Sequence, residues 1–283
     1  MATLIARNLK TLKKSLLGKK FRDKNIGLVP TMGAIHNGHL ALVKKSTNLS
    51  HVTIVTIFLN PIQFNNEEDL KNYPTSLKED IKILTKNKVD LIFIPSRKEM
   101  YPENFSTYIN LKKFDNILCG KKRKDHFSGV ATVVLKLFSL INPKYAFFGE
   151  KDYQQLVIIK KLVKDFNLNV KVQSVKTVRD SQGLALSSRN KLLSTNQKIK
   201  ATKINKILRK ITLKNLKSQK AFSSFFKRKL NFYGISKIEY LEVRDNKSLE
   251  LYSSKDIIGK SYRVFIAVKI GKVRLIDNFK IGK

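Results

Sequence analysis

Residues 25–49 have the sequence NIGLVPTMGAIHNGHLALVKKSTNL, and this stretch decides the fold. The apolar run at 25–30 predicts a strand that ends at Pro30, and the spacing of leucine and valine over 38–49 predicts an amphipathic helix. Two glycines and two histidines lie in and beside the connection between them. In open parallel sheets ligands bind where a strand ends and a helix begins, because the free N–H groups of the helix favour anions.

The same alternation continues for about 170 residues. Further apolar runs predict strands at 51–59, 89–94, 145–148 and 170–175, and amphipathic spacing predicts helices at 76–86, 130–141 and 153–166. Strands that alternate with helices form right-handed crossovers and a parallel sheet. We therefore expect an α/β, Rossmann-like parallel sheet with helices on both faces.

The pattern changes after residue 176. Residues 196–233 predict two basic amphipathic helices, and strands follow at 238–243, 262–268 and 273–276, the last two joined by a turn at Gly271-Lys272. We expect two domains, a catalytic one at 1–176 and a smaller α+β one at 177–283.

The composition is that of a globular protein with a large basic excess. Of 283 residues 42% are hydrophobic, and the formal net charge is +36 from 46 Lys, 11 Arg and 21 acidic residues. Lysine in place of arginine favours solvated surface charge over nucleic-acid recognition, so we expect no specific nucleic-acid partner. Residues 191–229, which hold 13 basic and no acidic residues, keep a polyanion-binding surface open as an alternative. No apolar run approaches a membrane span, and Cys119 is the only cysteine, which suits a cytoplasmic protein.

Common nucleotide and hydrolase signatures are missing. The sequence has no phosphate-loop motif, no G-x-G-x-x-G fingerprint and no G-x-S-x-G elbow. The candidate for phosphate chemistry is the connection that carries His36 and His39, because two imidazoles at a helix start can donate to phosphate oxygens and stabilise a leaving pyrophosphate. An H-x-x-H metal pair is a weaker alternative, since no third ligand is evident.

Three further segments carry groups suited to binding. Asn60 and Gln63 follow the predicted strand 51–59, and their amides suit a hydroxyl and a carboxylate. After strand 145–148, Gly149-Glu150-Lys151-Asp152 offers a tight turn, a point charge for phosphates and a carboxylate, and Gln155 follows one helical turn later. The third is the segment 178–190, where two serines precede an arginine and form a compact phosphate clamp or, alternatively, an ordinary helix cap.

Four segments together resemble the pantoate–β-alanine ligase family of the HxGH nucleotidyltransferase superfamily. They are PTMGAIHNGH, NPIQF, FFGEKDYQQ and LALSSRN, which occur in the family's order between residues 25 and 195. The resemblance implies that ATP and pantoate form pantoyl adenylate and pyrophosphate, and that β-alanine then displaces AMP to give pantothenate. It also implies Mg²⁺ bound with ATP, a cytoplasmic homodimer, and a C-terminal domain that acts as a lid.

The resemblance also implies roles for individual residues. His39, His36 and Lys151 correspond to the catalytic residues, and Gln63, Gln155 and Asn60 to those that bind pantoate and β-alanine. The expected ATP-binding residues are Met32, Gly33, Ala34, Ile35, His36, Asn37, Gly38, His39, Gly149, Glu150, Lys151, Asp152, Val178, Leu186, Ser187, Ser188 and Arg189. No metal ligand can be assigned.

The chain departs from the family pattern at three places. Thr75 stands where the family usually has Arg, Lys124-Asp125 where it has Pro-Gly, and Gln182 where it has Asp. Two other functions stay open on the sequence: a nucleotidyltransferase that stops after attaching a nucleotide to a phosphorylated acceptor, and a nucleic-acid-binding protein that uses residues 191–229.

Overall fold

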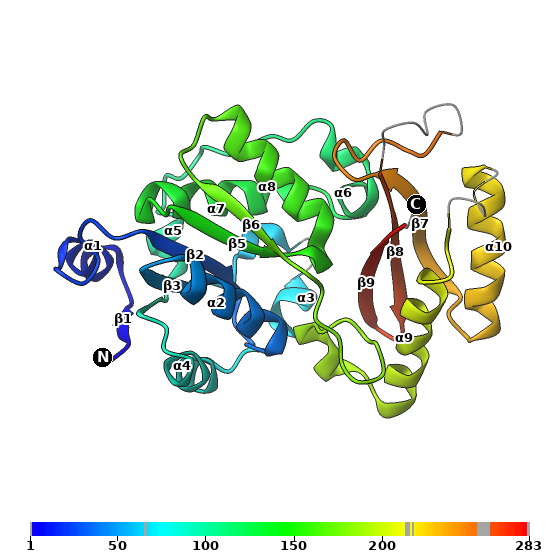
Figure 1. Ribbon diagram of the computed structural model, residues 1–283, viewed down its shortest axis with the longest axis horizontal. Coiled ribbons are helices and arrows are strands. Elements are labelled where there is room, and N and C mark those ends of the chain that lie inside the picture. Colours follow the sequence, from blue (N-terminus) through cyan, green and yellow to red (C-terminus); the bar gives the residue numbers. More distant parts are fainter. Residues whose placement is uncertain (1, 65–66, 213–215, 217, 254–260, 282–283) are drawn as a thin grey trace. The chain divides into compact units, whose positions relative to one another are not determined.

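The computed structural model describes residues 2–64, 67–212, 216, 218–253 and 261–281. It divides the chain into two compact units: Met1–Glu150 with Ile158–Lys176, and Lys151–Val157 with Thr177–Lys283. Each unit has its own sheet (Figure 1).

The first unit is built on a six-stranded sheet of order β1-β4-β3-β2-β5-β6, in which every adjacent pair is parallel. Helices flank this sheet (Figure 1). The predicted α/β class is therefore confirmed. The strands are β1 (Leu4–Ala6), β2 (Ile26–Thr31), β3 (Val52–Ile57), β4 (Leu91–Phe93), β5 (Tyr145–Gly149) and β6 (Lys171–Val175).

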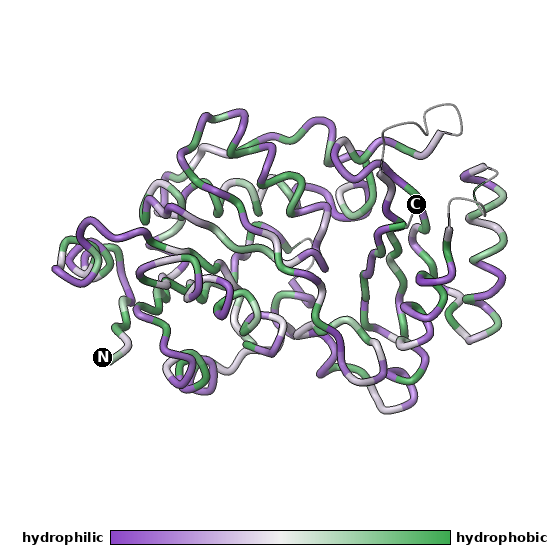
Figure 2. Tube along the Cα trace, in the orientation of Figure 1, coloured by the Kyte–Doolittle hydropathy of each residue, from purple (hydrophilic) through white to green (hydrophobic). Residues whose placement is uncertain are grey.

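The central strands are apolar because both of their faces are covered. All six residues of β3 are buried. Along helices such as α10 (Gln219–Phe232), in contrast, hydrophobic and hydrophilic colours alternate in Figure 2. From β2 the chain moves outward through β3 to β4, and it returns to the other side of β2 with β5. The strand order thus reverses between β2 and β5, and such a switch point is where open parallel sheets bind ligands.

Three of the four helices predicted before residue 177 begin and end within one residue of their predicted bounds, and the fourth is longer than predicted. The predicted helix 130–141 begins four residues earlier, at His126, after Asp125 adopts a left-handed conformation. β1 and α1 had no counterpart among the predicted elements. The α-helices that begin before residue 177 are α1 (Leu9–Leu17), α2 (Asn37–Leu49), α3 (Glu67–Lys71), α4 (Leu77–Lys86), α5 (Arg97–Met100), α6 (Leu118–Lys122), α7 (His126–Ile141) and α8 (Tyr153–Asp165); the 3₁₀ turns are η1 (Pro61–Gln63), η2 (Phe114–Asn116) and η3 (Glu150–Asp152).

The second unit contains a three-stranded antiparallel sheet of order β7-β8-β9 and, among its described residues, the helices α9 and α10. Gly271, with φ +59, lies in the tight turn between Ile270 and Val273, as predicted. This confirms the smaller α+β part of the fold. The elements are η4 (Ser188–Leu192), α9 (Thr195–Leu208), α10 (Gln219–Phe232), β7 (Lys237–Asp245), β8 (Tyr262–Ile270) and β9 (Val273–Lys280).

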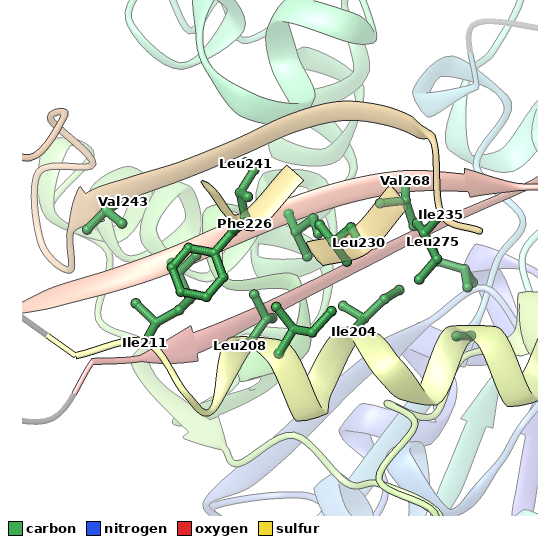
Figure 3. Packing of buried hydrophobic residues seen from close by; sticks show 14 of the residues in the cluster. Ile204, Leu208, Ile211, Phe226, Leu230, Ile235, Leu241, Val243, Val268 and Leu275 are labelled. Atoms are coloured by element: carbon green, nitrogen blue, oxygen red, sulfur yellow. The ribbon is translucent and has the colours of Figure 1, made fainter. Parts of the chain in front are cut away.

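The helices α9 and α10 bury their apolar faces against this sheet (Figure 3). Phe222 and Phe226 are each 2% exposed and lie in the cluster. Phe225, on the same helix, is instead 44% exposed, and Lys229 Nζ lies over its ring. In the part of the chain that the structure describes, every helix is too short or too polar to span a bilayer.

Candidate active site

Three predicted segments begin at the same edge of the parallel sheet. β2 ends at Thr31, β3 at Ile57 and β5 at Gly149, and β2 pairs in parallel with both of the others. Parallel neighbours place their carboxyl ends together. The histidine loop, the Asn60–Gln63 turn and the Gly149-Glu150 turn therefore leave the sheet beside one another at its switch point.

The two histidines form the N-terminal cap of α2. The Nδ1 atom of His36 accepts the N–H of Gly38 at 3.0 Å, and the Nδ1 atom of His39 accepts the N–H of His36 at 3.4 Å. Their rings stack with centroids 4.1 Å apart. A neutral imidazole that accepts at Nδ1 carries its proton at Nε2. The cap therefore fixes both rings with Nε2–H as the donor, which is the form that can donate to a phosphate.

The loop before the cap is buried and held by a carboxylate. Gly33, Ala34 and Ile35 are buried, whereas the histidines are half-buried. The N–H groups of Ala34 and Ile35 donate to the side chain of Asp80, a residue that the sequence did not single out. Asp80 lies 45 residues from Ile35, on α4, and no spacing rule connects a lone acid there with the loop.

A chain of hydrogen bonds orients Gln63. The hydroxyl of Tyr101 donates to Asn60 Oδ1 at 2.9 Å, and Asn60 Nδ2 donates to Gln63 Oε1 at 3.2 Å and to the Gly129 carbonyl at 3.1 Å. Gln63 Nε2 lies 2.6 Å from Met32 Sδ. Because Oε1 is the acceptor in this chain, the amide of Gln63 presents its Nε2 donor toward the histidine loop.

Asn60 is buried and its side chain is already hydrogen-bonded within the protein. It is 1% exposed, and both ends of its amide take part in the chain of bonds to Gln63 and Tyr101. Burial, and after it the neighbouring Tyr108, raises the pKa of Tyr101 far above its ordinary value. The Tyr101 hydroxyl therefore stays protonated and donates.

A second pair of side chains holds the main chain of Gln63. Its carbonyl accepts from Arg123 Nη2 at 3.1 Å and from His126 Nδ1 at 2.7 Å. Since a carbonyl only accepts, His126 Nδ1 carries a proton, and its Nε2 can accept from Arg123 Nη1 at 3.1 Å. Gly129 makes room for this turn, because a Cβ there would lie 2.8 Å from the carbonyl carbon of Ile62.

The predicted residues that follow β5 lie partly in the second unit. Lys151 Nζ is 3.3 Å from Asp152 Oδ1, and the Lys151 carbonyl accepts from Asn278 Nδ2 on β9 at 2.8 Å. Glu150 Oε1 accepts from the Ser174 hydroxyl at 3.2 Å. Gln155 is half-buried on α8.

The predicted segment 178–190 begins with a small hairpin in the second unit. The N–H of Leu186 donates to the Val178 carbonyl at 3.0 Å, so these two predicted ATP contacts lie side by side. Ser187 caps η4 by accepting the N–H of Arg189 at 3.3 Å, while Ser188 is 5% exposed. The helix cap that the sequence left open is therefore present.

A buried ion pair holds the start of this hairpin. Arg179 donates to both oxygens of Asp277 at 2.7 and 2.8 Å. Asp180 Oδ1 accepts the N–H groups of Gln182 and Leu184, and Gly183 has φ +91. Gln182, one of the departures from the family pattern, thus contributes its main chain to this turn.

Comparisons with known proteins agree with these segments. A family model described as pantoate-beta-alanine ligase matches residues 4–280. This chain belongs to the pantoate–β-alanine ligase family. The pantothenate synthetase of Wigglesworthia glossinidia brevipalpis is 44% identical over 273 residues, which are 93% of each chain.

Two solved ligase structures have the same fold over nearly the whole chain. The ligase of Francisella tularensis, complexed with beta-gamma ATP and β-alanine, is 43% identical, covers 99% of this chain and 98% of its own, and has a TM-score of 0.84. The pantothenate synthetase of Thermus thermophilus is 35% identical with coverage of 98% and 99% and a TM-score of 0.86. The resemblance inferred from four segments is confirmed, and the chain is a ligase.

Proposed function

We propose that this ligase condenses (R)-pantoate with β-alanine in two steps driven by ATP. In the first, a carboxylate oxygen of pantoate attacks the α-phosphorus, and the bond to the bridging oxygen breaks to release pyrophosphate. In the second, the amine of β-alanine attacks the acyl carbon, the bond to AMP breaks, and the amine loses a proton. The products are pantothenate, AMP and pyrophosphate.

The contact between Gln63 and Met32 is the observation that carries this proposal. The family pattern assigns Gln63 to pantoate and Met32 to the ATP loop, and their side chains meet at 2.6 Å in one unit. A weakly nucleophilic carboxylate reacts with ATP only when it is aligned on the α-phosphorus. Residues assigned to the two reactants are thus neighbours, as adenylate formation requires. We assign Asn60 to the orientation of Gln63, since its own amide is buried.

The histidine cap supplies donors for the charge that develops on pyrophosphate. His36 and His39 are held by their Nδ1 atoms, so each neutral ring offers an Nε2 proton. Donors that are fixed before the reaction lose little free energy to reorganisation during it. We propose His39 as the proton donor and His36 as its partner on the phosphates.

We propose the remaining ATP contacts from the family pattern. Lys151 supplies a point charge for the phosphates, and Arg189 with Ser187 and Ser188 supplies a fork and two hydroxyls. Met32 to His39, Gly149 to Asp152, Val178 and Leu186 complete the nucleotide contacts, and Gln155 is the second pantoate contact.

Magnesium fits the carboxylate chemistry of this region. Within the described residues, no three His, Cys, Asp or Glu side chains cluster as a metal cage. Mg²⁺ that accompanies ATP needs only one or two carboxylates, since phosphates and waters complete its shell. Asp152, at 46% side-chain exposure, is the residue we propose for this role; when bound, the ion screens triphosphate charge. We also propose that the chain works as a cytoplasmic homodimer.

The test is AMP release by the purified protein with ATP, pantoate and β-alanine, and with each omitted in turn. Pyrophosphate exchange into ATP should require pantoate and should not require β-alanine. His39→Ala and Lys151→Ala should each lower exchange by about 100-fold or more. His51→Ala and Lys161→Ala, which replace an exposed histidine and an exposed lysine elsewhere, are the controls. Exchange that needs a phosphorylated acceptor in place of pantoate would instead indicate a nucleotidyltransferase.

A further inference from the structure

A buried carboxylate on α4 binds the main chain of the histidine loop. Asp80 is 2% exposed, and its two oxygens accept separate N–H groups: Oδ2 that of Ala34 at 2.8 Å, and Oδ1 that of Ile35 at 2.7 Å. Hydrogen bonds to a charged acceptor are about twice as strong as neutral ones. Because the residue is buried, this carboxylate serves the loop rather than the surface.

Two successive residues of the loop have positive φ, +83 at Gly33 and +51 at Ala34. The N–H groups of Ala34 and Ile35 both donate to the same carboxylate, and successive N–H groups that converge in this way bind anions. An alanine in this conformation is strained, and the bonds to Asp80 offset that strain. A Cβ at Gly33 would lie 2.9 Å from Asp80 Oδ2, so the glycine permits the close approach.

The held segment leads directly into the catalytic cap. Ile35 is followed by His36, which caps α2 and whose own N–H donates to His39. A shift of the backbone at Ile35 therefore moves both rings. We propose that Asp80 is a positioning residue for the nucleotide loop: it fixes the backbone at Ala34 and Ile35 and thereby the two histidine rings. This inference rests on the proposed function only where it concerns ATP.

One consequence concerns which loop groups meet the triphosphate. Because the Ala34 and Ile35 amides donate to Asp80, they are not the loop's phosphate donors. That role passes to the half-buried end of the loop, where the rings of His36 and His39 can donate from Nε2.

The test compares Asp80→Asn with Glu79→Gln. Asparagine keeps the size of Asp80 but turns an NH₂ group toward one of the two N–H donors, whereas Glu79 is exposed on the same helix and loses the same charge. In Asp80→Asn we expect kcat/KM for ATP to fall about 10- to 100-fold, because a misplacement of about 1 Å can cost about 100-fold in rate. KM for β-alanine should stay within about twofold, and Glu79→Gln should match the wild type in both.

Hydrogen exchange of the loop is the second measurement, and it does not depend on catalysis. The amides of Ala34 and Ile35 should exchange at least about tenfold faster in Asp80→Asn, while those of β3 keep their protection. If Asp80→Asn fails to fold, Asp80→Glu, which keeps both oxygens and displaces them by one methylene, should show the same selective loss in smaller degree.

The outcomes separate the inference from the function. The positioning role would be overturned if a folded but less stable variant kept the wild-type kcat and KM for ATP. It would also be overturned if the loop amides lost no more protection from hydrogen exchange than the amides of β3. A wild-type protein without pantoate-dependent exchange would overturn the proposed function, and loop exchange would still decide the role of Asp80.

Discussion

We expect Gly129→Ala to lower the activity strongly while it lowers the stability only a little. Gly129 lies in α7 against the η1 turn, and an added Cβ would lie 2.8 Å from the carbonyl carbon of Ile62 and 2.9 Å from the nitrogen of Gln63. Both neighbours are main-chain atoms, so no flexible side chain can swing away. To restore an ordinary contact of 3.4 Å from 2.8 Å, the turn must move by about 0.6 Å.

Two opposing effects decide the magnitude. Alanine favours a helix by about 1 kcal/mol over glycine, while overpacking costs about 1–3 kcal/mol. The net loss of unfolding free energy should therefore stay below about 2 kcal/mol. The displaced turn carries Gln63, and a misplacement near 1 Å can cost about 100-fold in rate. We expect kcat/KM for pantoate to fall about tenfold or more.

The assay is pantoate-dependent pyrophosphate exchange, measured beside urea unfolding of the same preparations. Ser128→Ala is the matched control, because it changes the adjacent residue of α7 and adds no atom. The control should keep the wild-type rate. A Gly129→Ala protein with kcat/KM for pantoate within about twofold of the wild type would refute the view that close packing at Gly129 places Gln63.

Three further substitutions test other contacts. Tyr101→Phe should remove the donor to Asn60 Oδ1, cost about 1–3 kcal/mol of stability and raise KM for pantoate. Because the raised pKa keeps the Tyr101 hydroxyl protonated, the ratio of the variant's KM to that of the wild type should stay constant across the neutral pH range. A KM ratio that changes with pH would contradict this. Asp277→Asn should cost about 3–5 kcal/mol in urea unfolding, because Arg179 loses its buried partner, and a loss below about 1 kcal/mol would contradict this. Burial and a neighbouring carboxylate raise the pKa of Asp115, so the folded state holds the proton more tightly and stability falls as pH rises through that pKa. Asp115→Asn should therefore raise the urea midpoint of unfolding at neutral pH and leave it unchanged at acidic pH. An equal rise of the midpoint at both pH values would contradict the inferred direction of the pKa shift.

The sheet was predictable because a strand covered on both faces must be apolar throughout. β5 is a nearly continuous apolar run and β3 consists of β-branched residues, two of them buried threonines, while the helices between them show apolar residues at helical spacing. β1 is only three residues long, too short for any periodicity. The helix α1 carries three lysines among nine residues, so its apolar face is narrow in the sequence.

The candidate site was predictable only where its residues follow strand ends. The histidine loop and Gln63 do so, and sheet topology alone brings them together. Asp80 and Tyr101 act on that loop and turn from positions 45 and 41 residues away from their partners. Such contacts depend on how α4 and the segment after α5 pack against the unit, which one-dimensional spacing does not encode.

The departure at Lys124-Asp125 leaves the support of Gln63 intact for a conformational reason. Asp125 has φ +57, a left-handed conformation that glycine adopts freely and that aspartate tolerates better than most residues. Directly after this residue α7 begins at His126, and Arg123 and His126 both donate to the Gln63 carbonyl. We therefore expect that Asp125→Gly, which removes the side chain and keeps the left-handed conformation accessible, leaves these two bonds and the activity in place.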